Sequence, residues 1–161
     1  SMIKGKRHYD INKNNKKLPS VTTILGQTQS KEKQDSLARW RDKVGVNEAT
    51  RITDTAAARG TAMHNILEAY VNGTKRVDLT ELGKQAPTMA SLIIEKGLTN
   101  RLTEVWGNEV TLYYPDLYAG ATDLVGIYNG RESIIDFKQS NKHMPWLTIL
   151  CMAQTLLRGL I

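Results

Sequence analysis

The sequence has very little cysteine: Cys151 is the single cysteine among 161 residues. One thiol cannot form an internal disulfide framework or a thiolate zinc cluster, so both kinds of site are excluded, and we expect Cys151 to be a small buried apolar residue. There is no apolar run of about 18 residues and no signal peptide, so we expect a soluble protein that is not secreted. Internal repeats and low-complexity tracts are absent as well.

What the sequence does have is an excess of positive charge. Its 22 lysines and arginines outnumber its 16 acidic residues, which gives a net charge of +6 and an isoelectric point near 9.5. This balance favours a polyanionic partner, but composition alone leaves nucleic acid an even choice because many basic proteins bind none. The length and the mass of 18.0 kDa suit one domain over residues 2–161 with a real core.

The hydrophobic pattern changes its period along the chain. Residues 2–17 are basic with few apolar side chains, and they predict either a solvated arm, which could contact phosphates, or a weak hairpin. Helical periodicity then predicts three helices, at 31–44, at 46–71 and from Pro87 to about Trp106. Alternation predicts three strands, at 109–114, 118–128 and 131–139, and the apolar stretch 146–161 predicts a last helix. Helices, an antiparallel meander and a final helix indicate an α/β fold in α+β order.

The last two predicted strands form a hairpin that carries unexpected polar residues. Asn129-Gly130 favours a two-residue type I′ turn between them. Asp136 and Lys138 are two residues apart on the outgoing strand, so they share one face, and Asp123 on the incoming strand can approach them across the ladder. A carboxylate in an apolar strand is costly to bury unless it is paired or bound to metal. We interpret the three residues as a cation site, with a plain Asp136–Lys138 surface pair as the alternative.

A second polar cluster lies on the predicted helix 46–71. His64 and Glu68 are four residues apart, so they share a face one turn apart, and Arg59 precedes them by about a turn. A His–Glu pair of this kind is most often a simple hydrogen-bonded pair. If this face points at the hairpin carboxylates, the imidazole can complete a metal shell, and Glu68 can orient the ring or a metal-bound water.

Together the two clusters predict a site with one histidine and two aspartates, His64, Asp123 and Asp136, around Mg²⁺ or Mn²⁺. The backbone carbonyl of Phe137 is a further candidate ligand. Such an ion would lower the pKa of a bound water and polarise a phosphoryl oxygen, which is the chemistry of phosphodiester hydrolysis. Lys138 would position the nucleophile or stabilise charge in the transition state.

Candidate contacts to nucleic acid fall into two sets, each with a simpler alternative. Basic residues could bind phosphates or be merely solvated: Arg39, Arg41, Arg51, Arg59 and Lys142. Aromatic residues could stack on bases or pack in the core: Trp106, Tyr113, Tyr114 and Tyr118. Pro115-Asp116 is interpreted as turn chemistry, and Glu109 either joins the metal site or stays on the surface.

The polar residues occur in an order that resembles the PD-(D/E)XK nucleases, in particular their RecB-like exonuclease branch. The matching motifs are Gly60-Thr61-Ala-Met-His64-Asn-Ile-Leu-Glu68, then Gly120 to Asp123, then Asp136-Phe-Lys138. The upstream stretch 19–24 and the segment 39–41 are also similar to phage and mitochondrial exonucleases. The resemblance covers roughly residues 18–145, which is most of the chain.

This resemblance implies a restriction-endonuclease-like central mixed sheet flanked by helices. It implies metal ligation by His64, Asp123 and Asp136, a catalytic role for Lys138, and Mg²⁺- or Mn²⁺-dependent exonucleolytic cleavage of DNA from single-stranded ends. The implied setting is phage or mobile-element DNA processing in the cytoplasm of a bacterial or phage-infected cell. The alternative is a catalytically impaired nuclease-fold protein that binds nucleic acid.

The C-terminus departs from the pattern of this branch, in which a helix after the lysine-bearing strand carries Gln-x-x-x-Tyr. Here Gln154 is followed four residues later by Arg158, and the run 146–161 is short and apolar. We interpret the fold as shortened at this end. The run is a buried helix, a truncated end, or a surface that pairs with a second copy to give a homodimer.

Overall fold

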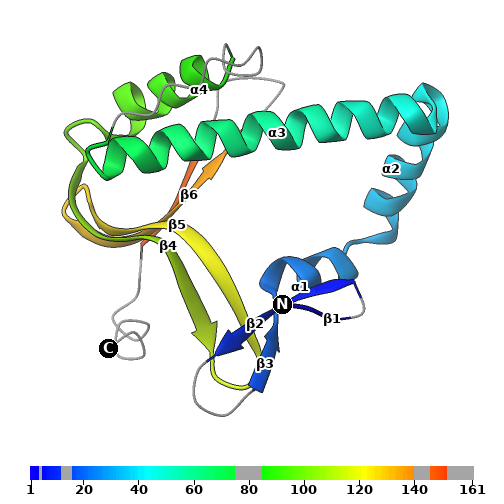
Figure 1. The fold of residues 1–161 in the computed structure, drawn as a ribbon, viewed down its shortest axis with the longest axis horizontal. Helices are drawn as coiled ribbons and strands as arrows, with labels where there is room; N and C mark the ends of the chain where they lie inside the picture. The colour runs from blue at the N-terminus through cyan, green and yellow to red at the C-terminus, as the bar shows by residue number, and fades with distance from the viewer. Residues whose placement is uncertain (4, 12–15, 75–84, 140–145, 152–161) are drawn as a thin grey trace. The chain divides into compact units, whose positions relative to one another are not determined.

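The computed structural model describes residues 1–3, 5–11, 16–74, 85–139 and 146–151, with residues 11, 16 and 146–151 described by their backbone alone. They fall into two compact units: unit 1 comprises Ser1–Arg51 and Thr111–Ala121, and unit 2 comprises Ile52–Val110 and Thr122–Ile161. Helices and strands are both present, which confirms the α+β fold (Figure 1). The prediction of one domain over residues 2–161 stays a prediction. Within the described ranges no helix is both long and apolar enough to cross a membrane.

Unit 1 begins with a small antiparallel sheet. Strands β1 (Met2–Ile3), β2 (Lys6–Ile11) and β3 (Lys16–Pro19) pair in that order. Of the two forms predicted for residues 2–17, the structure therefore has the hairpin. Beyond β3, Ser20 forms a parallel bridge with Ala119, which joins this sheet within unit 1 to the start of strand β5 (Tyr118–Tyr128).

Three helices follow, and their ends are set by local signals. After α1 (Val21–Gln27), α2 (Lys31–Val44) starts where the Ser30 hydroxyl accepts a hydrogen bond from the Lys33 amide at 3.3 Å. It ends at Gly45, whose φ of 85° suits a residue without a Cβ. The long helix α3 (Val46–Val71) follows immediately. The predicted bounds 31–44 and 46–71 are confirmed.

The helix predicted from Pro87 to about Trp106 is longer than the observed helix, and the strand predicted at 109–114 is shorter than the observed strand. Helix α4 (Gln85–Ile93) continues as a π-helical segment η2 (Ile94–Leu98), where the helix ends. Strand β4 (Leu102–Tyr114) begins shortly afterwards, within the range predicted to be helical. Asn100 has a φ of 60°, a left-handed conformation that breaks the helix. Leu102 and Val105 follow the apolar residues of the helix at a helical spacing, but they belong to β4 because this segment fills the place beside β5 in the sheet.

The second sheet has the strand order β4-β5-β6-β7. Strands β5 (Tyr118–Tyr128) and β6 (Arg131–Lys138) are antiparallel and match the predicted hairpin. Asn129 and Gly130 have φ values of 48° and 74°, both positive as a type I′ turn requires, so this prediction is confirmed.

The predicted helix 146–161 is wrong over its first six residues, which form β7 (Trp146–Cys151). This strand pairs antiparallel with β6, from Lys138–Trp146 to Ser133–Cys151. Without it, β6 would present a row of unpaired backbone groups, and the tryptophan, threonine and isoleucine of the segment favour a strand. Residues 152–161 lie outside the described part of the chain, and so do Gln154 and Arg158. The homodimer through this segment stays a prediction.

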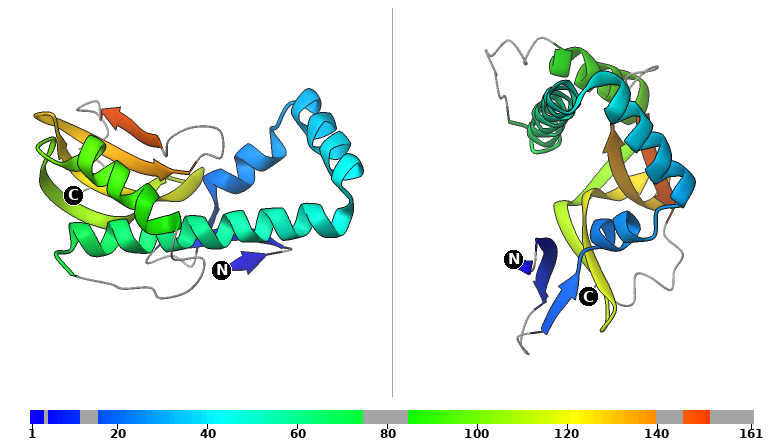
Figure 2. Two further views of the ribbon diagram at one scale, coloured as in Figure 1. Left: turned by 90° about the horizontal axis from the view of Figure 1, so that it is seen from above. Right: turned by 90° about the vertical axis from the view of Figure 1, so that its right-hand side faces the viewer.

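The core of unit 2 lies between its helices and one face of its sheet. α4 runs beside the C-terminal part of α3, and both cover the same face of β4, β5 and β6 (Figures 1 and 2). The buried side chains from these elements include Met63, Leu67, Ala90, Ile93, Leu98, Leu124, Ile135 and Phe137. Each large apolar side chain contributes about 1.5–3 kcal/mol on burial. This packing holds the His64 turn of α3 against Asp123 in the middle of β5 and against Phe137 near the end of β6.

Candidate active site

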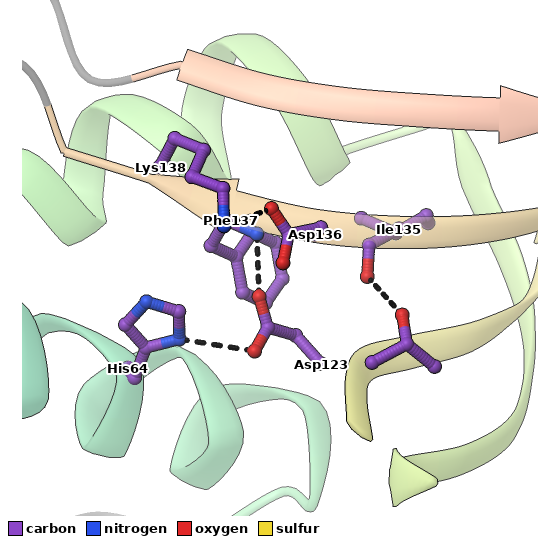
Figure 3. Close-up of polar contacts among 7 residues, drawn as sticks. His64, Asp123, Ile135, Asp136, Phe137 and Lys138 are labelled. Atoms are coloured by element: carbon purple, nitrogen blue, oxygen red, sulfur yellow. Dashed lines mark hydrogen bonds and ion pairs between the residues drawn. The ribbon is translucent and has the colours of Figure 1, made fainter. Parts of the chain in front are cut away.

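The site is centred on a contact between α3 and β5. The Nδ1 atom of His64 lies 3.2 Å from the Oδ1 atom of Asp123 (Figure 3). The His64 side chain is 33% exposed and that of Asp123 is 15% exposed, so the pair is shielded but reachable from solvent. The prediction that the His64 face points at a hairpin carboxylate is therefore confirmed for Asp123.

Asp123 can reach both α3 and β6 because strands β5 and β6 separate beside it. Their register runs from Tyr128–Arg131 to Leu124–Ile135 and stops there. Beyond this point side chains continue the pairing: the Phe137 amide donates to the Oδ2 atom of Asp123 at 2.5 Å, and the Thr122 hydroxyl donates to the Ile135 carbonyl at 3.0 Å (Figure 3). Thr122 was not among the residues predicted from the sequence.

Asp136 and Lys138 form an ion pair on β6. The Lys138 Nζ atom lies 2.5 Å from the Oδ2 atom of Asp136, and both side chains are partly exposed. An exposed pair of this kind contributes at most about 1 kcal/mol to stability. The pair also lies close enough to the imidazole for the charge of Asp136 to act on His64. The structure thus contains the surface pair named as an alternative and places it beside the His64–Asp123 contact.

The pKa of His64 reports the electrostatic character of the site. The hydrogen bond to Asp123 raises the pKa of His64 above its ordinary value, and this effect exceeds the opposing effect of burial. The negative charges of Asp123, Asp136 and Glu109 raise that pKa further. Three carboxylates therefore favour a positive charge at this place, whether it is carried by a proton on His64 or by a bound cation.

Glu109 is the third of these carboxylates and comes from β4. It is exposed and has a φ of 50°, a left-handed conformation that is uncommon for a residue with a side chain. Its negative charge contributes to the raised pKa of His64, and its place in the metal site stays a prediction.

Two other predicted site residues have a simpler placement. The Phe137 side chain is buried, and its ring packs edge-on against the His64 ring with centroids 6.1 Å apart. Its carbonyl as a metal ligand stays a prediction. Glu68 is exposed on α3, and within the described residues its side chain forms no hydrogen bond or ion pair with His64 or Asp123, so its catalytic role also stays a prediction.

A polar bridge that was not predicted from the sequence joins the end of β6 to α3. The Gln139 amide nitrogen donates to the Ala56 carbonyl at 2.5 Å, and its oxygen accepts from the Arg59 Nε atom at 3.1 Å. Arg59 also donates to the Gln85 side chain at 3.1 Å. A Cβ atom at Gly60 would lie 2.8 Å from the Gln139 amide nitrogen, so the glycine makes room for this bridge. Its signal in the sequence is the glycine inside an otherwise regular helix.

The residues predicted to contact nucleic acid are dispersed. Arg39 and Arg41 are exposed on α2, Arg59 is half-buried in the bridge to Gln139, and Lys142 lies outside the described residues. The aromatic side chains are largely exposed: Trp106, Tyr113, Tyr114 and Tyr118. Core packing, the simpler alternative for these four residues, is therefore wrong. Phosphate contact and base stacking stay predictions.

The predicted metal ligands fit a divalent cation in type and in charge. His64, Asp123 and Asp136 supply one imidazole and two carboxylates, and the surrounding field favours a positive ion. In this structure the Asp123 carboxylate contacts the His64 ring and accepts a hydrogen bond from the Phe137 amide, and Asp136 forms an ion pair with Lys138. Among the described residues, no group of three or more His, Cys, Asp or Glu side chains is arranged to hold a metal ion.

Comparison with known proteins identifies two similar sequences. Mitochondrial genome maintenance exonuclease 1 of Mus musculus is 28% identical over 153 residues, which is 88% of this chain and 44% of that protein. The Homo sapiens protein of the same name is 25% identical over 135 residues, which is 81% of this chain and 39% of that protein. The chain thus spans less than half the length of these relatives. No protein-family model matches it.

Proposed function

We propose that this chain is a metal-dependent DNA exonuclease of the PD-(D/E)XK superfamily and its RecB-like branch. The observation that carries the proposal is the convergence of His64, Asp123 and the Asp136–Lys138 pair from three different elements on one partly shielded, negatively charged place. The similarity to two proteins named as exonucleases supports the same reaction. Cleavage from single-stranded ends, a setting in phage or mobile-element DNA processing, and a cytoplasmic location belong to the proposal as well.

His64, Asp123 and Asp136 would hold Mg²⁺ or Mn²⁺, with the Phe137 carbonyl as a further ligand. When bound, such an ion lowers the pKa of water and polarises a phosphoryl oxygen. Binding requires that His64 be neutral, because a protonated imidazole has no lone pair to offer. The Phe137 amide fixes the Asp123 carboxylate through one oxygen and leaves the other for the His64 side of the site.

Lys138 has a separate task in this proposal. Its ammonium is held at the site by Asp136, and its side chain remains largely exposed, so it can turn toward a bound phosphodiester. There it would orient the attacking water or stabilise the charge that develops on the phosphoryl oxygens. Glu68 would orient the His64 ring or the attacking water from the next turn of α3.

The second candidate is a catalytically impaired nuclease-fold protein that binds nucleic acid. The observation in its favour is that the described carboxylates already have protein partners, with Asp136 bonded to Lys138 and Asp123 to His64. In this case Lys138 would act as a permanent counter-ion in place of a metal.

Digestion of end-labelled DNA separates the two candidates. We expect the chain to shorten single-stranded DNA from its ends with Mg²⁺ or Mn²⁺ and to leave it intact in EDTA. Double-stranded DNA and a covalently closed single-stranded circle, which has no ends, serve as matched substrates. Binding without metal-dependent cleavage would favour the second candidate, and cleavage of the circle would contradict exonucleolytic action.

A further inference from the structure

The net positive charge of the chain is confined to unit 1. Unit 1 carries twelve of the 22 lysines and arginines and six of the 16 acidic residues, which is a formal charge of +6. Unit 2, which contains the candidate active site, carries ten residues of each sign and is formally neutral. A polyanion is therefore attracted to unit 1, although the proposed chemistry belongs to unit 2.

Unit 1 also exposes aromatic and apolar side chains at the tip of the β4–β5 hairpin. Tyr113, Tyr114 and Tyr118 are 51%, 53% and 40% exposed, and Leu117 is 57% exposed. The rings of Tyr114 and Tyr118 lie 5.9 Å apart and are tilted by 31°, so they form a pair across the turn. Isolated exposed apolar residues are ordinary, whereas four at one hairpin tip make it a candidate contact surface.

The backbone of the turn keeps Tyr114 and Tyr118 close together. The Leu117 amide donates to the Tyr114 carbonyl at 3.2 Å, and Asp116 has a φ of 64°. With Pro115 before it, this is the pattern of a type II turn, which confirms the interpretation of Pro115-Asp116 as turn chemistry. A closed turn presents Tyr114 and Tyr118 together and limits the entropy lost when a ligand stacks on them.

Basic strands lie beside this tip within unit 1. Ala119, which follows Tyr118, is bridged to Ser20, and the Ser20 amide donates to the Arg7 carbonyl at 3.0 Å. Because the bridge is parallel, β3 and the start of β5 run in the same direction, and both begin at the same end of unit 1 (Figures 1 and 2). Exposed Lys17 therefore lies on β3, beside the start of β5, and its Nζ atom is 3.8 Å from the Oδ1 atom of Asp10. Exposed Arg7 lies on β2, one strand further from the tyrosines.

We propose that the Tyr114–Tyr118 pair is a stacking platform for unpaired DNA bases, with the basic strands of unit 1 as its phosphate contacts. Aromatic side chains bind bases of any sequence through their faces, and a neighbouring basic groove binds the backbone. Charge decides against a second copy of the chain as the occupant, because two tips would bring two units of charge +6 together. The proposal rests on the proposed function for its ligand but not on cleavage.

Binding in EDTA tests the platform independently of catalysis. The probe is a fluorescein-labelled thymidine oligonucleotide, and the matched ligand is an abasic oligonucleotide with the same number of phosphates. We expect Tyr114→Ala/Tyr118→Ala to bind the thymidine ligand roughly tenfold or more weakly than the parent chain, and Tyr114→Phe/Tyr118→Phe to bind it about as well. On the abasic ligand all three proteins should bind alike.

Three results would overturn the proposal. The first is a double-alanine variant that binds the thymidine ligand like the parent chain. The second is an equal loss on the abasic ligand, which would assign the effect to the backbone. The third is a dimer of the parent chain, seen by sedimentation, that the alanine variant abolishes. If the alanine variant fails to fold, Tyr114→Leu/Tyr118→Leu tests the same loss of rings with bulk retained. A chain that binds in this way but cuts no DNA would disprove only the proposed function.

Discussion

Asp123 holds the His64 ring with one carboxylate oxygen, at 3.2 Å, and uses the other to accept a hydrogen bond from the Phe137 amide. One side chain thereby joins α3, β5 and β6 at the point where the β5–β6 ladder stops. The same carboxylate is a structural link and a candidate metal ligand. Variants of Asp123 should therefore affect both stability and chemistry, and the two effects can be separated.

Asp123→Ala should destabilise the fold by about 1–3 kcal/mol, because the buried Phe137 amide loses its acceptor. Asp123→Asn keeps an oxygen for that amide, so its loss should be smaller. Urea unfolding in EDTA measures both. Equal stability of the parent chain and the alanine variant would show that the Phe137 contact does not contribute.

His64 should make the stability of the metal-free chain depend on pH. Its pKa is raised in the folded state, so the stabilisation is fully present below the unfolded pKa of about 6.5 and is lost as pH rises through the higher folded pKa. The free energy of unfolding of the parent chain minus that of His64→Gln, measured in EDTA, should fall across this window. A difference that grows with pH would contradict the assignment.

Gly60 and Gln139 should show coupled energetics. In Gly60→Ala the new Cβ displaces Gln139 from its bonds with Ala56 and Arg59. In a Gln139→Ala background the same change should instead stabilise α3 by about 1 kcal/mol through helix propensity. A double-mutant cycle by chemical unfolding measures the coupling, and additive effects would show that Gln139 does not depend on the glycine.

Lys138→Ala should separate metal binding from cleavage. The exposed Asp136–Lys138 pair contributes little to stability, so the variant should fold normally and leave Asp136 free for the ion. We expect Mn²⁺ binding, measured by calorimetry, to be retained or tightened, and the cleavage rate to fall by about 10²–10³-fold. Loss of Mn²⁺ binding would show that the lysine holds the site together.

Local signals made part of this structure predictable. The Ser30 cap, Gly45 and the Asn129-Gly130 turn determine neighbouring backbone, so α2, α3 and the β5–β6 hairpin could be predicted from short stretches. Asp136 and Lys138 could be placed on one strand face because they are two residues apart. The His64–Asp123 contact spans far more sequence, and it was expected from the order of the motifs and not from any local pattern.

The features that sequence reasoning missed depend on distant partners. Leu102 and Val105 fit a helical stripe and a strand equally well, and the place beside β5 decides between them. β7 is a strand because β6 offers an edge. Thr122 and Gln139 carry no local mark of their roles, since each bonds to a backbone carbonyl of another segment. An alternating pattern shows which side chains share a face of a strand, but it does not show whether another element covers that face. The exposure of Tyr113, Tyr114 and Tyr118 could therefore not be predicted.

The most direct test of the central claim is single-turnover cleavage of end-labelled single-stranded DNA in Mn²⁺ by the parent chain, Asp123→Asn and Glu132→Gln. Both variants replace one carboxylate of the hairpin by an amide, but Glu132 lies at the turn end of β6, opposite Ile127 and away from the site. We expect Glu132→Gln to cut like the parent chain and Asp123→Asn to leave the DNA intact. Equal cleavage by all three proteins would contradict the assignment of the active site.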